Sequence, residues 1–240
     1  MSAFADTRWS QVRRLGADSP SGRAALGWLC EAAWEPLCRH AQRRGLDRHA
    51  AEDAVQAFMA RILERGLGSP DPDRGRFRSW LIAAFWHFLA DRADSQRAAK
   101  RGGGQIAQTL SSVGEVPAAD PDFDRDWARS VLRRTLDRLA AEQADAQRFV
   151  VLRPFLSANP EADAYAAAAA RLDLPSGAVR VAVHRLRKRF AELLRSEVAE
   201  TLADSDPGTL DGELKVLAAA LAESRSPDDH RDAPASTAGR

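Results

Sequence analysis

Apolar residues recur along most of this chain at spacings of three and four, which predicts a series of amphipathic helices. Clusters of glycine and proline separate the periodic stretches and mark the turns between them. The pattern therefore predicts an all-α protein. The expected helices cover residues 22–44, 47–67, 77–101, 144–156, 163–172 and 209–222, with one more starting near residue 126 and another near residue 176.

The most informative stretch is a pair of predicted helices between residues 163 and 202. The first helix is an alanine block that ends at Leu172. Residues 173–176 break the pattern, because Asp173 tolerates turn geometry and Pro175 fits the first turn of a new helix. The second helix has one apolar stripe, with basic side chains between the apolar positions. A short helix, a tight turn and a basic second helix are typical of a DNA-binding helix-turn-helix.

The second helix of this pair carries candidate DNA-binding residues. Small side chains at its start would let the backbone approach phosphates, and arginine and histidine side chains further along could reach base edges. We expect phosphate contacts from Arg187, Lys188 and Arg189. The alternative is an ordinary helical hairpin with a solvated basic face. The predicted DNA-binding set is Ser176, Gly177, Arg180, Val181, His184, Arg185, Arg187 and Lys188.

The helix expected from Phe77 combines an excess of large apolar side chains with a basic end. Leu81, Phe85 and Phe88 share a stripe with Phe77, which indicates a core face, whereas Trp86 falls on the far side. Such a helix could stack unpaired bases and hold the phosphate backbone. The alternative is that the aromatic side chains fill a bundle core. The candidates for contact with single-stranded DNA are Trp80, Trp86, His87, Arg92, Arg97, Lys100 and Arg101.

Composition narrows the class of protein without adding a site. Hydrophobic residues make up 45% of the 240 residues and charged residues 29%, which is typical of a globular chain, and sparse β-branched residues favour helices. The formal net charge is only +1, so a nucleic-acid-binding surface has to be local. The five histidines lack metal-ligand spacing, and no nucleophile or dinucleotide-binding motif is present. We therefore expect no enzyme activity, no cofactor and no metal.

The cysteines and the start of the chain indicate the compartment. Cys30 and Cys38 would lie ~12 Å apart along one helix, beyond the reach of a disulfide, which suits a reducing cytosol. No apolar run follows the first arginines, so we expect no secretion signal. No stretch approaches the ~20 apolar residues of a membrane span. We expect a cytoplasmic protein without membrane insertion.

Stretches with little periodicity divide the chain into parts. The expected parts are an N-terminal extension (1–21), a helical bundle (22–104), a flexible linker (105–125), a helix-turn-helix domain (126–202), an extension helix (203–223) and a disordered tail (224–240).

In this order, the parts resemble bacterial RNA polymerase sigma factors of the extracytoplasmic-function type, within the sigma-70 family, in a long variant with a C-terminal extension. The string AEDAVQAFMARIL (51–63) is similar to the segment of sigma region 2 that docks on the clamp helices of the polymerase. FRSWLIAAFWHFLADRADSQRAAKR (77–101) is similar to the segment that melts and reads the −10 promoter element. SGAVRVAVHRLRKRF (176–190) is similar to the helix of region 4 that reads the −35 element.

The resemblance implies two small helical domains, a region 2-like bundle and a region 4-like helix-turn-helix, joined by a flexible linker. It also implies a promoter-specificity factor that binds core RNA polymerase and promoter DNA and has no catalysis of its own. Such a chain would be monomeric when free, with an anti-sigma factor or another regulator as a further candidate partner. The residues that match the polymerase-binding segment are Asp53, Gln56, Met59 and Arg61.

Six positions depart from the pattern of the family, and two of them are Ala166 and Ala167, which replace a polar pair after Tyr165. Ala57 follows the glutamine of the docking segment where an acidic residue is common, which bears on polymerase binding. Trp86 stands where a polar residue is common, and His87 stands where asparagine is usual. Both differences bear on base preference at −10. Asp173 replaces the common turn glycine but can still enter the left-handed region.

Two other functions remain open. One is a helix-turn-helix regulator that binds duplex operator DNA without polymerase, and the other is a helical adaptor whose basic face binds an acidic protein. The expected helix at 209–222 raises a separate question, because it could cover the helix-turn-helix domain. In that case, deleting residues 205–240 would raise promoter activity.

Overall fold

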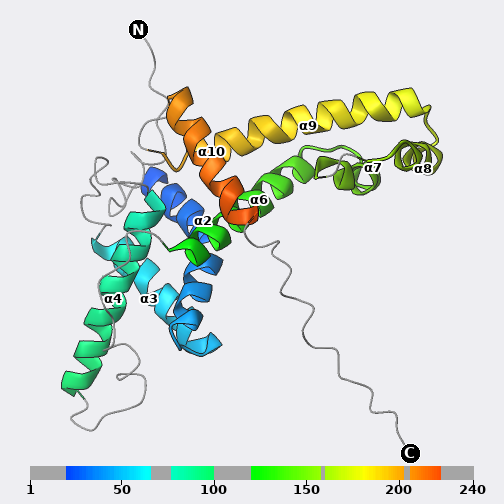
Figure 1. Ribbon diagram of the computed structural model, residues 1–240. Coiled ribbons are helices and arrows are strands. Elements are labelled where there is room, and N and C mark those ends of the chain that lie inside the picture. Colours follow the sequence, from blue (N-terminus) through cyan, green and yellow to red (C-terminus); the bar gives the residue numbers. More distant parts are fainter. Residues whose placement is uncertain (1–19, 66–76, 100–119, 158–159, 203–205, 223–240) are drawn as a thin grey trace, which may run out of the picture.

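Helices make up all of the regular secondary structure among the described residues (Figure 1), which confirms the all-α class for that part of the chain. The computed structural model describes residues 20–65, 77–99, 120–157, 160–202 and 206–222. Its elements are α2 (Pro20–Arg43), α3 (Arg48–Arg65), α4 (Phe77–Ala99), α6 (Pro121–Ala141), α7 (Ala146–Leu152), the 3-10 helix η2 (Arg153–Leu156), α8 (Ala162–Leu172), α9 (Ser176–Ala199) and α10 (Pro207–Ala222).

The helices α2, α3 and α4 form the first block of the molecule. Helix α2 continues through Pro36, and the turn after it uses Gly45 at a φ of 94°, a conformation that glycine adopts without steric cost. Helix α3 packs against the predicted apolar stripe of α4. The ring of Phe58 on α3 lies 5.1 Å from the ring of Phe85 and 5.4 Å from that of Phe88, measured between centroids.

Helix α6 begins earlier than the apolar pattern predicted. The side chain of Asp120 caps it by accepting a hydrogen bond from the Phe123 amide at 2.9 Å, and Pro121 occupies the first turn. Residues 121–125, which were expected to belong to the linker, are therefore helical. The apolar spacing missed this start because the first turn is set by its cap and not by its core contacts.

Asp120 also joins α6 to α2. Burial by itself would raise the pKa of this carboxyl. Three neighbours lower the pKa of Asp120: His40, whose Nδ1 lies 3.1 Å from Asp120 Oδ2, the Phe123 amide and the charge of Arg43. Their combined effect outweighs burial, and the pKa falls to about 2. Asp120 is thus ionised and holds the start of α6 against a buried histidine of the first block.

Helices α6 and α9 run side by side in opposite directions (Figure 1). Arg138 of α6 donates to Glu197 of α9 at 2.6 Å, and Glu142, one turn later, accepts two bonds from Arg189 at 2.7 Å each. As the residue number rises along α6 from 138 to 142, the number of the bonded residue on α9 falls from 197 to 189, as expected for antiparallel helices. Helix α9 is therefore one continuous rod from the helix-turn-helix to the first block.

The two blocks share a core. Phe123, Trp127 and Val131 of α6 and Val198 at the end of α9 are buried in the same apolar cluster as α2, α3 and α4. Charged groups rim this junction, where Arg43 of α2 donates to Asp126 of α6 at 2.6 Å. The structure therefore joins the two predicted domains through continuous packing, although most of the predicted linker lies outside the described residues.

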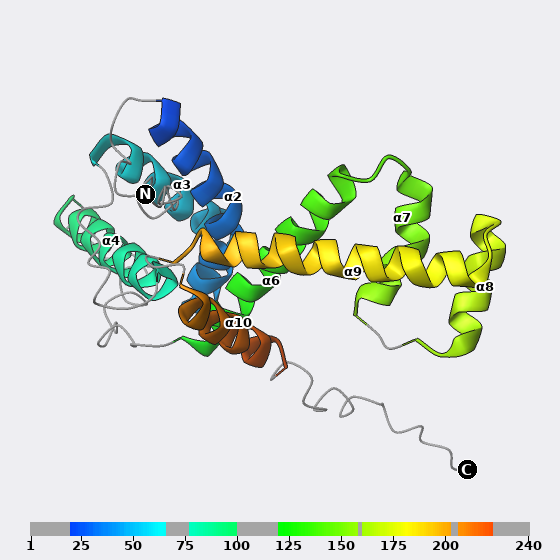
Figure 2. The same cartoon turned by 90° about the horizontal axis from the view of Figure 1, so that it is seen from above.

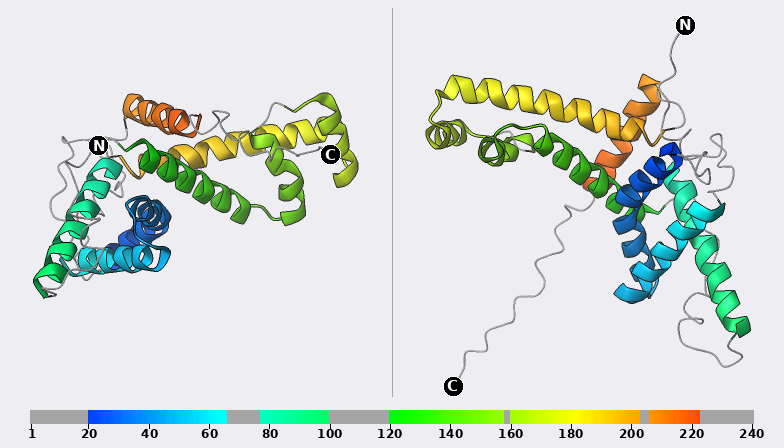
Figure 3. Two further views of the ribbon diagram at one scale, coloured as in Figure 1. Left: turned by 60° about the horizontal axis from the view of Figure 1, so that its bottom comes forward. Right: turned by 180° about the vertical axis from the view of Figure 1, so that it is seen from behind.

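Helix α10 closes this junction. It packs on α6 and on the C-terminal part of α9 (Figure 3), with Leu217 buried in the shared core. The guanidinium of Arg78 on α4, which is 2% exposed, binds Asp124 of α6 at 2.5 Å and also Glu213 of α10, which is 5% exposed. One buried arginine thus ties together α4, α6 and α10.

Candidate nucleic-acid interface

The turn between α8 and α9 has the geometry of a helix-turn-helix. Asp173 adopts the left-handed conformation with φ 50° and ψ 48°, as predicted, and the Leu174 amide donates to the Ala169 carbonyl at 3.0 Å. Pro175 is extended, and α9 begins at the next residue. The predicted helix ends on both sides of this turn are confirmed.

Small side chains allow α8 to lie close against α9. Ala168 and Ala169 are buried in a second apolar cluster with Val179 and Val183 of α9. Segment α7–η2 supplies the third side of this cluster through Phe149 and other residues. The basic side chains of α9 are consequently left on the face that points away from the cluster.

That exposed face carries most of the predicted DNA-binding residues. With ~100° of rotation per residue, Arg180, His184 and Lys188 fall within ~80° of one another around α9, and Val181 and Arg185 follow at its edge. In Figure 2 the N-terminal half of α9 crosses the view with no other described element over it, because α10 lies beside its C-terminal half. The exposed members of the predicted set are Ser176, Gly177, Arg180, Val181, His184, Arg185 and Lys188.

Arg180 has a defined position on this face. Its Cζ atom lies 4.5 Å from the centroid of the Tyr165 ring on α8, within the range of a cation–π contact. Tyr165 in turn packs on Phe155, with 4.9 Å between ring centroids. The guanidinium is therefore oriented by the helix-turn-helix itself while remaining exposed.

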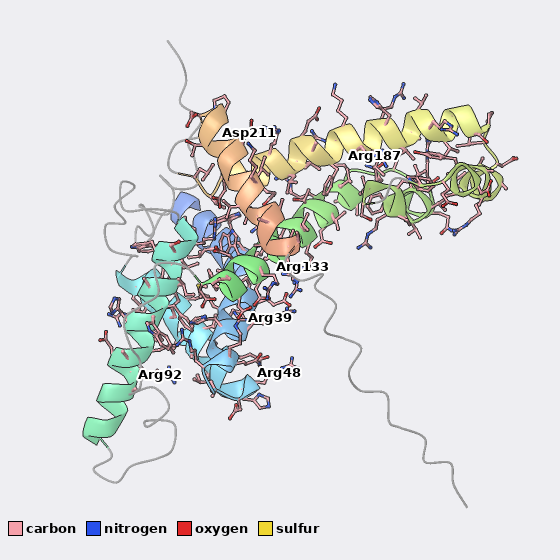
Figure 4. All side chains as sticks on the ribbon, in the orientation of Figure 1. Arg39, Arg48, Arg92, Arg133, Arg187 and Asp211 are labelled. Carbon is pink, nitrogen blue, oxygen red and sulfur yellow. The ribbon has the colours of Figure 1, made fainter. Side chains whose placement is uncertain are left out.

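Arg187 and Arg189, which were expected to bind phosphates, form hydrogen bonds within the protein. Arg187 is half-buried, and its Nε donates to the Phe155 carbonyl at 2.9 Å, so it holds η2 against α9 (Figure 4). Arg189 binds Glu142 and Glu192, which raise the pKa of its guanidinium and compensate its charge. Lys188 lies between them on the exposed face.

Trp86 of α4, which was expected to contact single-stranded DNA, is buried in this structure. This side chain is only 4% exposed. Its ring lies 5.7 Å from that of His40 and 4.6 Å from the Arg44 guanidinium carbon, both measured to the centroid of the Trp86 ring. Trp80 is half-buried and packs on Phe77. In this structure Trp86 is thus a core group, because α2 covers the side of α4 that the helical wheel left outside.

The remaining candidates on this helix are placed unevenly. His87 is exposed and Arg92 is half-buried. Arg97 belongs to α4, but its side chain is outside the described part, as are Lys100 and Arg101 altogether. His87 and Arg92 are therefore the two described residues of this helix that remain available for a ligand.

The predicted polymerase-binding residues of α3 do not share one surface. Asp53 and Gln56 are exposed and lie three residues apart on one side of the helix. Met59 is 5% exposed and belongs to the shared core, so it does not lie at the surface of this structure. Arg61 is half-buried, 3.2 Å from Asp91 of α4 and over the ring of Phe88. Only Asp53 and Gln56 form an open polar patch.

The described part of the chain holds no group of three or more histidine, cysteine, aspartate or glutamate side chains that could bind a metal ion. None of its helices is long and apolar enough to cross a membrane. Cys38 is buried, and burial raises the pKa of its thiol to about 11, which makes it a poor nucleophile.

The structure also brings forward a residue that sequence reasoning missed. Arg148 on α7 is exposed and lines a hollow beside Arg185 of α9. Its position in an ordinary amphipathic helix carries no sequence signal, because the approach of α7 to α9 is a tertiary contact.

Comparison of the chain with models of protein families, with curated proteins and with solved structures found no match.

Proposed function

We propose that this protein is a promoter-specificity factor that binds core RNA polymerase and directs where transcription starts, as its sequence resemblance to sigma factors implies. The observation that carries the proposal is the exposed basic face of α9, presented by a helix-turn-helix with an ordered left-handed turn. In this proposal the polymerase supplies the catalysis and the chain supplies promoter choice.

Helix α9 would enter the major groove of the −35 element. Arg180 and His184 would meet base edges there, with Arg180 oriented by Tyr165. The start of the helix suits a close approach, since Ser176 and Gly177 are small and exposed and nothing lies within 4 Å of the Cβ position of Gly177. Lys188 would add a salt-dependent phosphate contact.

The first block would bind polymerase and the −10 element. Asp53 and Gln56 on α3 provide an open polar patch for the polymerase, and His87 with Arg92 on α4 would contact the −10 strand. In the free protein, α6 and α10 pack on this block through the shared core.

The shared core favours a second candidate function, a regulator that binds duplex DNA without polymerase. Such a protein needs only the exposed face of α9, and its blocks can stay packed together. The two candidates differ in whether polymerase is required, which makes them separable by experiment.

The test is transcription from a pool of promoter fragments by core RNA polymerase with and without the purified chain, together with footprinting of the same pool by the chain alone. Initiation at selected promoters only when the chain is present supports the proposal. A footprint by the chain alone, with no effect on initiation and no binding to polymerase, supports the second candidate and overturns the first. The absence of both would exclude both functions.

A further inference from the structure

A hollow of about 380 Å³ opens between α7 and the middle of α9, on the flank of the exposed basic face. Its polar wall consists of three arginines, one aspartate and one glutamine, and its floor is apolar. The residues that line it are Gln143, Ala144, Asp145, Arg148, Leu152, Ala182, Arg185, Leu186 and Arg189.

The charges around this hollow are unevenly compensated. Arg189 is bound to Glu142 on the rim. Asp145 caps α7 by accepting a hydrogen bond from the Arg148 amide at 2.9 Å, which leaves the Arg148 guanidinium itself outside that bond. Among the residues that the structure describes, neither Arg148 nor Arg185 forms an ion pair with a carboxylate. Two arginine side chains from different helices thus line one hollow, and among the described residues neither has a carboxylate partner.

The position of the hollow indicates which anion it would bind. Relative to Arg180, Arg185 lies ~140° and Arg189 ~180° around α9, so the hollow borders the base-reading face rather than forming part of it. When a helix occupies the major groove, the phosphate backbone runs along its sides, and elements next to the recognition helix contact it. Guanidinium groups match the oxygen geometry of a phosphate through paired hydrogen bonds.

We propose that this hollow binds a phosphate group of the DNA backbone, held between Arg148 and Arg185, and that Arg148 is a DNA-binding residue outside the helix-turn-helix. The inference rests on the proposed binding of duplex DNA by α9, but it does not depend on polymerase. It adds an anchor on α7, beside α9.

The central variant is Arg148→Gln in the full chain, with Arg153→Gln as the matched control. Arg153 is also exposed, five residues further on, and lines a different hollow against α6. Binding to a selected duplex and to a scrambled duplex is measured over a range of KCl concentrations. We expect Arg148→Gln to weaken both by the same factor and to reduce the slope of log K against log salt by about 0.9, the value of one phosphate contact. Arg153→Gln should leave the slope unchanged.

Single methylphosphonate substitutions then locate the phosphate. One neutral linkage should weaken the wild-type protein more than it weakens Arg148→Gln, because that variant keeps only the Arg185 part of the contact. Equal slopes for wild type, Arg148→Gln and Arg153→Gln would overturn the backbone contact.

A free phosphate anion is the other source of the same chemistry. Thermal unfolding in potassium phosphate and in potassium chloride of equal ionic strength distinguishes it, since a free anion in the hollow would stabilise the wild type and not Arg148→Gln. If phosphate stabilises only the wild type and the salt slopes for DNA binding are equal in all three proteins, the hollow binds a free anion. Its proposed role in DNA binding would then be overturned. If the wild type binds no duplex, the proposed function itself fails, and the thermal comparison still shows whether the hollow takes phosphate.

Discussion

Val181 is a large apolar side chain on the otherwise polar exposed face of α9. It is 51% exposed, next to Arg180, and its branched side chain contributes nothing to the buried cluster beneath. In the major groove, the apolar group that a protein can recognise is the 5-methyl of thymine. If α9 binds the major groove as proposed, we expect a preference for thymine beside the base that Arg180 would contact.

Replacing one thymine of the preferred duplex by deoxyuridine removes that methyl and nothing else. We expect the wild-type protein to bind the substituted duplex about fourfold more weakly, which corresponds to ~0.8 kcal/mol for one buried methyl-sized group. Val181→Ala should be insensitive to the same replacement. Fluorescence anisotropy on both duplexes measures this, and an equal loss in both proteins would remove the contact.

The two arginines beside Lys188 show how far a residue's identity determines its role. Arg187 and Arg189 have the same side chain as Arg180 and Arg185, and the sequence places all four on one helix. In the structure Arg187 is committed to a carbonyl of η2 and Arg189 to two carboxylates. A basic residue is available to DNA only if no nearer acceptor already binds its N–H groups.

At the scale of the element, α4 is buried on two sides. Its predicted stripe faces α3, and its far side, with Ile82 and Trp86, packs against the same core from the side of α2. The excess of aromatic side chains, which also suited base stacking, is explained by this double burial. Exposed His87 marks the narrow face that remains.

Trp86→Ala should therefore act on folding. We expect a loss of about 3–5 kcal/mol in the free energy of unfolding, as for the removal of a large buried aromatic side chain. His87→Ala, at an exposed position on the same helix, should change it by no more than about 0.5 kcal/mol. Urea unfolding followed by circular dichroism gives both values. Unchanged stability of Trp86→Ala with impaired opening of a duplex promoter would restore the base-stacking role.

At the scale of the whole molecule, α10 is a structural part of the junction between the blocks. It lies against α6 and the C-terminal half of α9, where Arg195 binds Asp211 at 2.8 Å, and it leaves the basic half of α9 uncovered. Its Glu213 neutralises buried Arg78. An inhibitory cover over the DNA-binding face, which would have made deletion activating, does not fit this placement.

Ending the chain after residue 202 should destabilise it without raising promoter activity. The truncation exposes apolar groups of the shared core and removes one of the two carboxylates on Arg78, whose burial makes a lost partner costly. Ending the chain after residue 222 keeps α10 and serves as the control, and Glu213→Gln should reproduce part of the loss, up to about 3–5 kcal/mol. Thermal unfolding and promoter assays on the three proteins decide this. Higher activity of the shorter chain at unchanged stability would instead make α10 inhibitory.

The all-α class of the described residues, most helix positions, the turn at Asp173 and the polarity of α9 could be predicted from the sequence alone. These features depend on interactions over a few residues, such as apolar periodicity, turn chemistry and helix propensity, so they can be predicted from neighbours along the chain. The start of α6 was missed because a capping aspartate, and not an apolar residue, sets it.

Tertiary packing sets which aromatic and basic side chains stay exposed to a ligand. It also sets whether the first block is separate from the helix-turn-helix part. Trp86 is buried because α2 crosses α4, Arg148 becomes a candidate because α7 meets α9, and Arg78 pairs with Glu213 across 135 positions of sequence. Such contacts form between segments that no local pattern relates. The physical reason is that burial and charge pairing are properties of the packed molecule, whereas helix formation is largely a property of its segments.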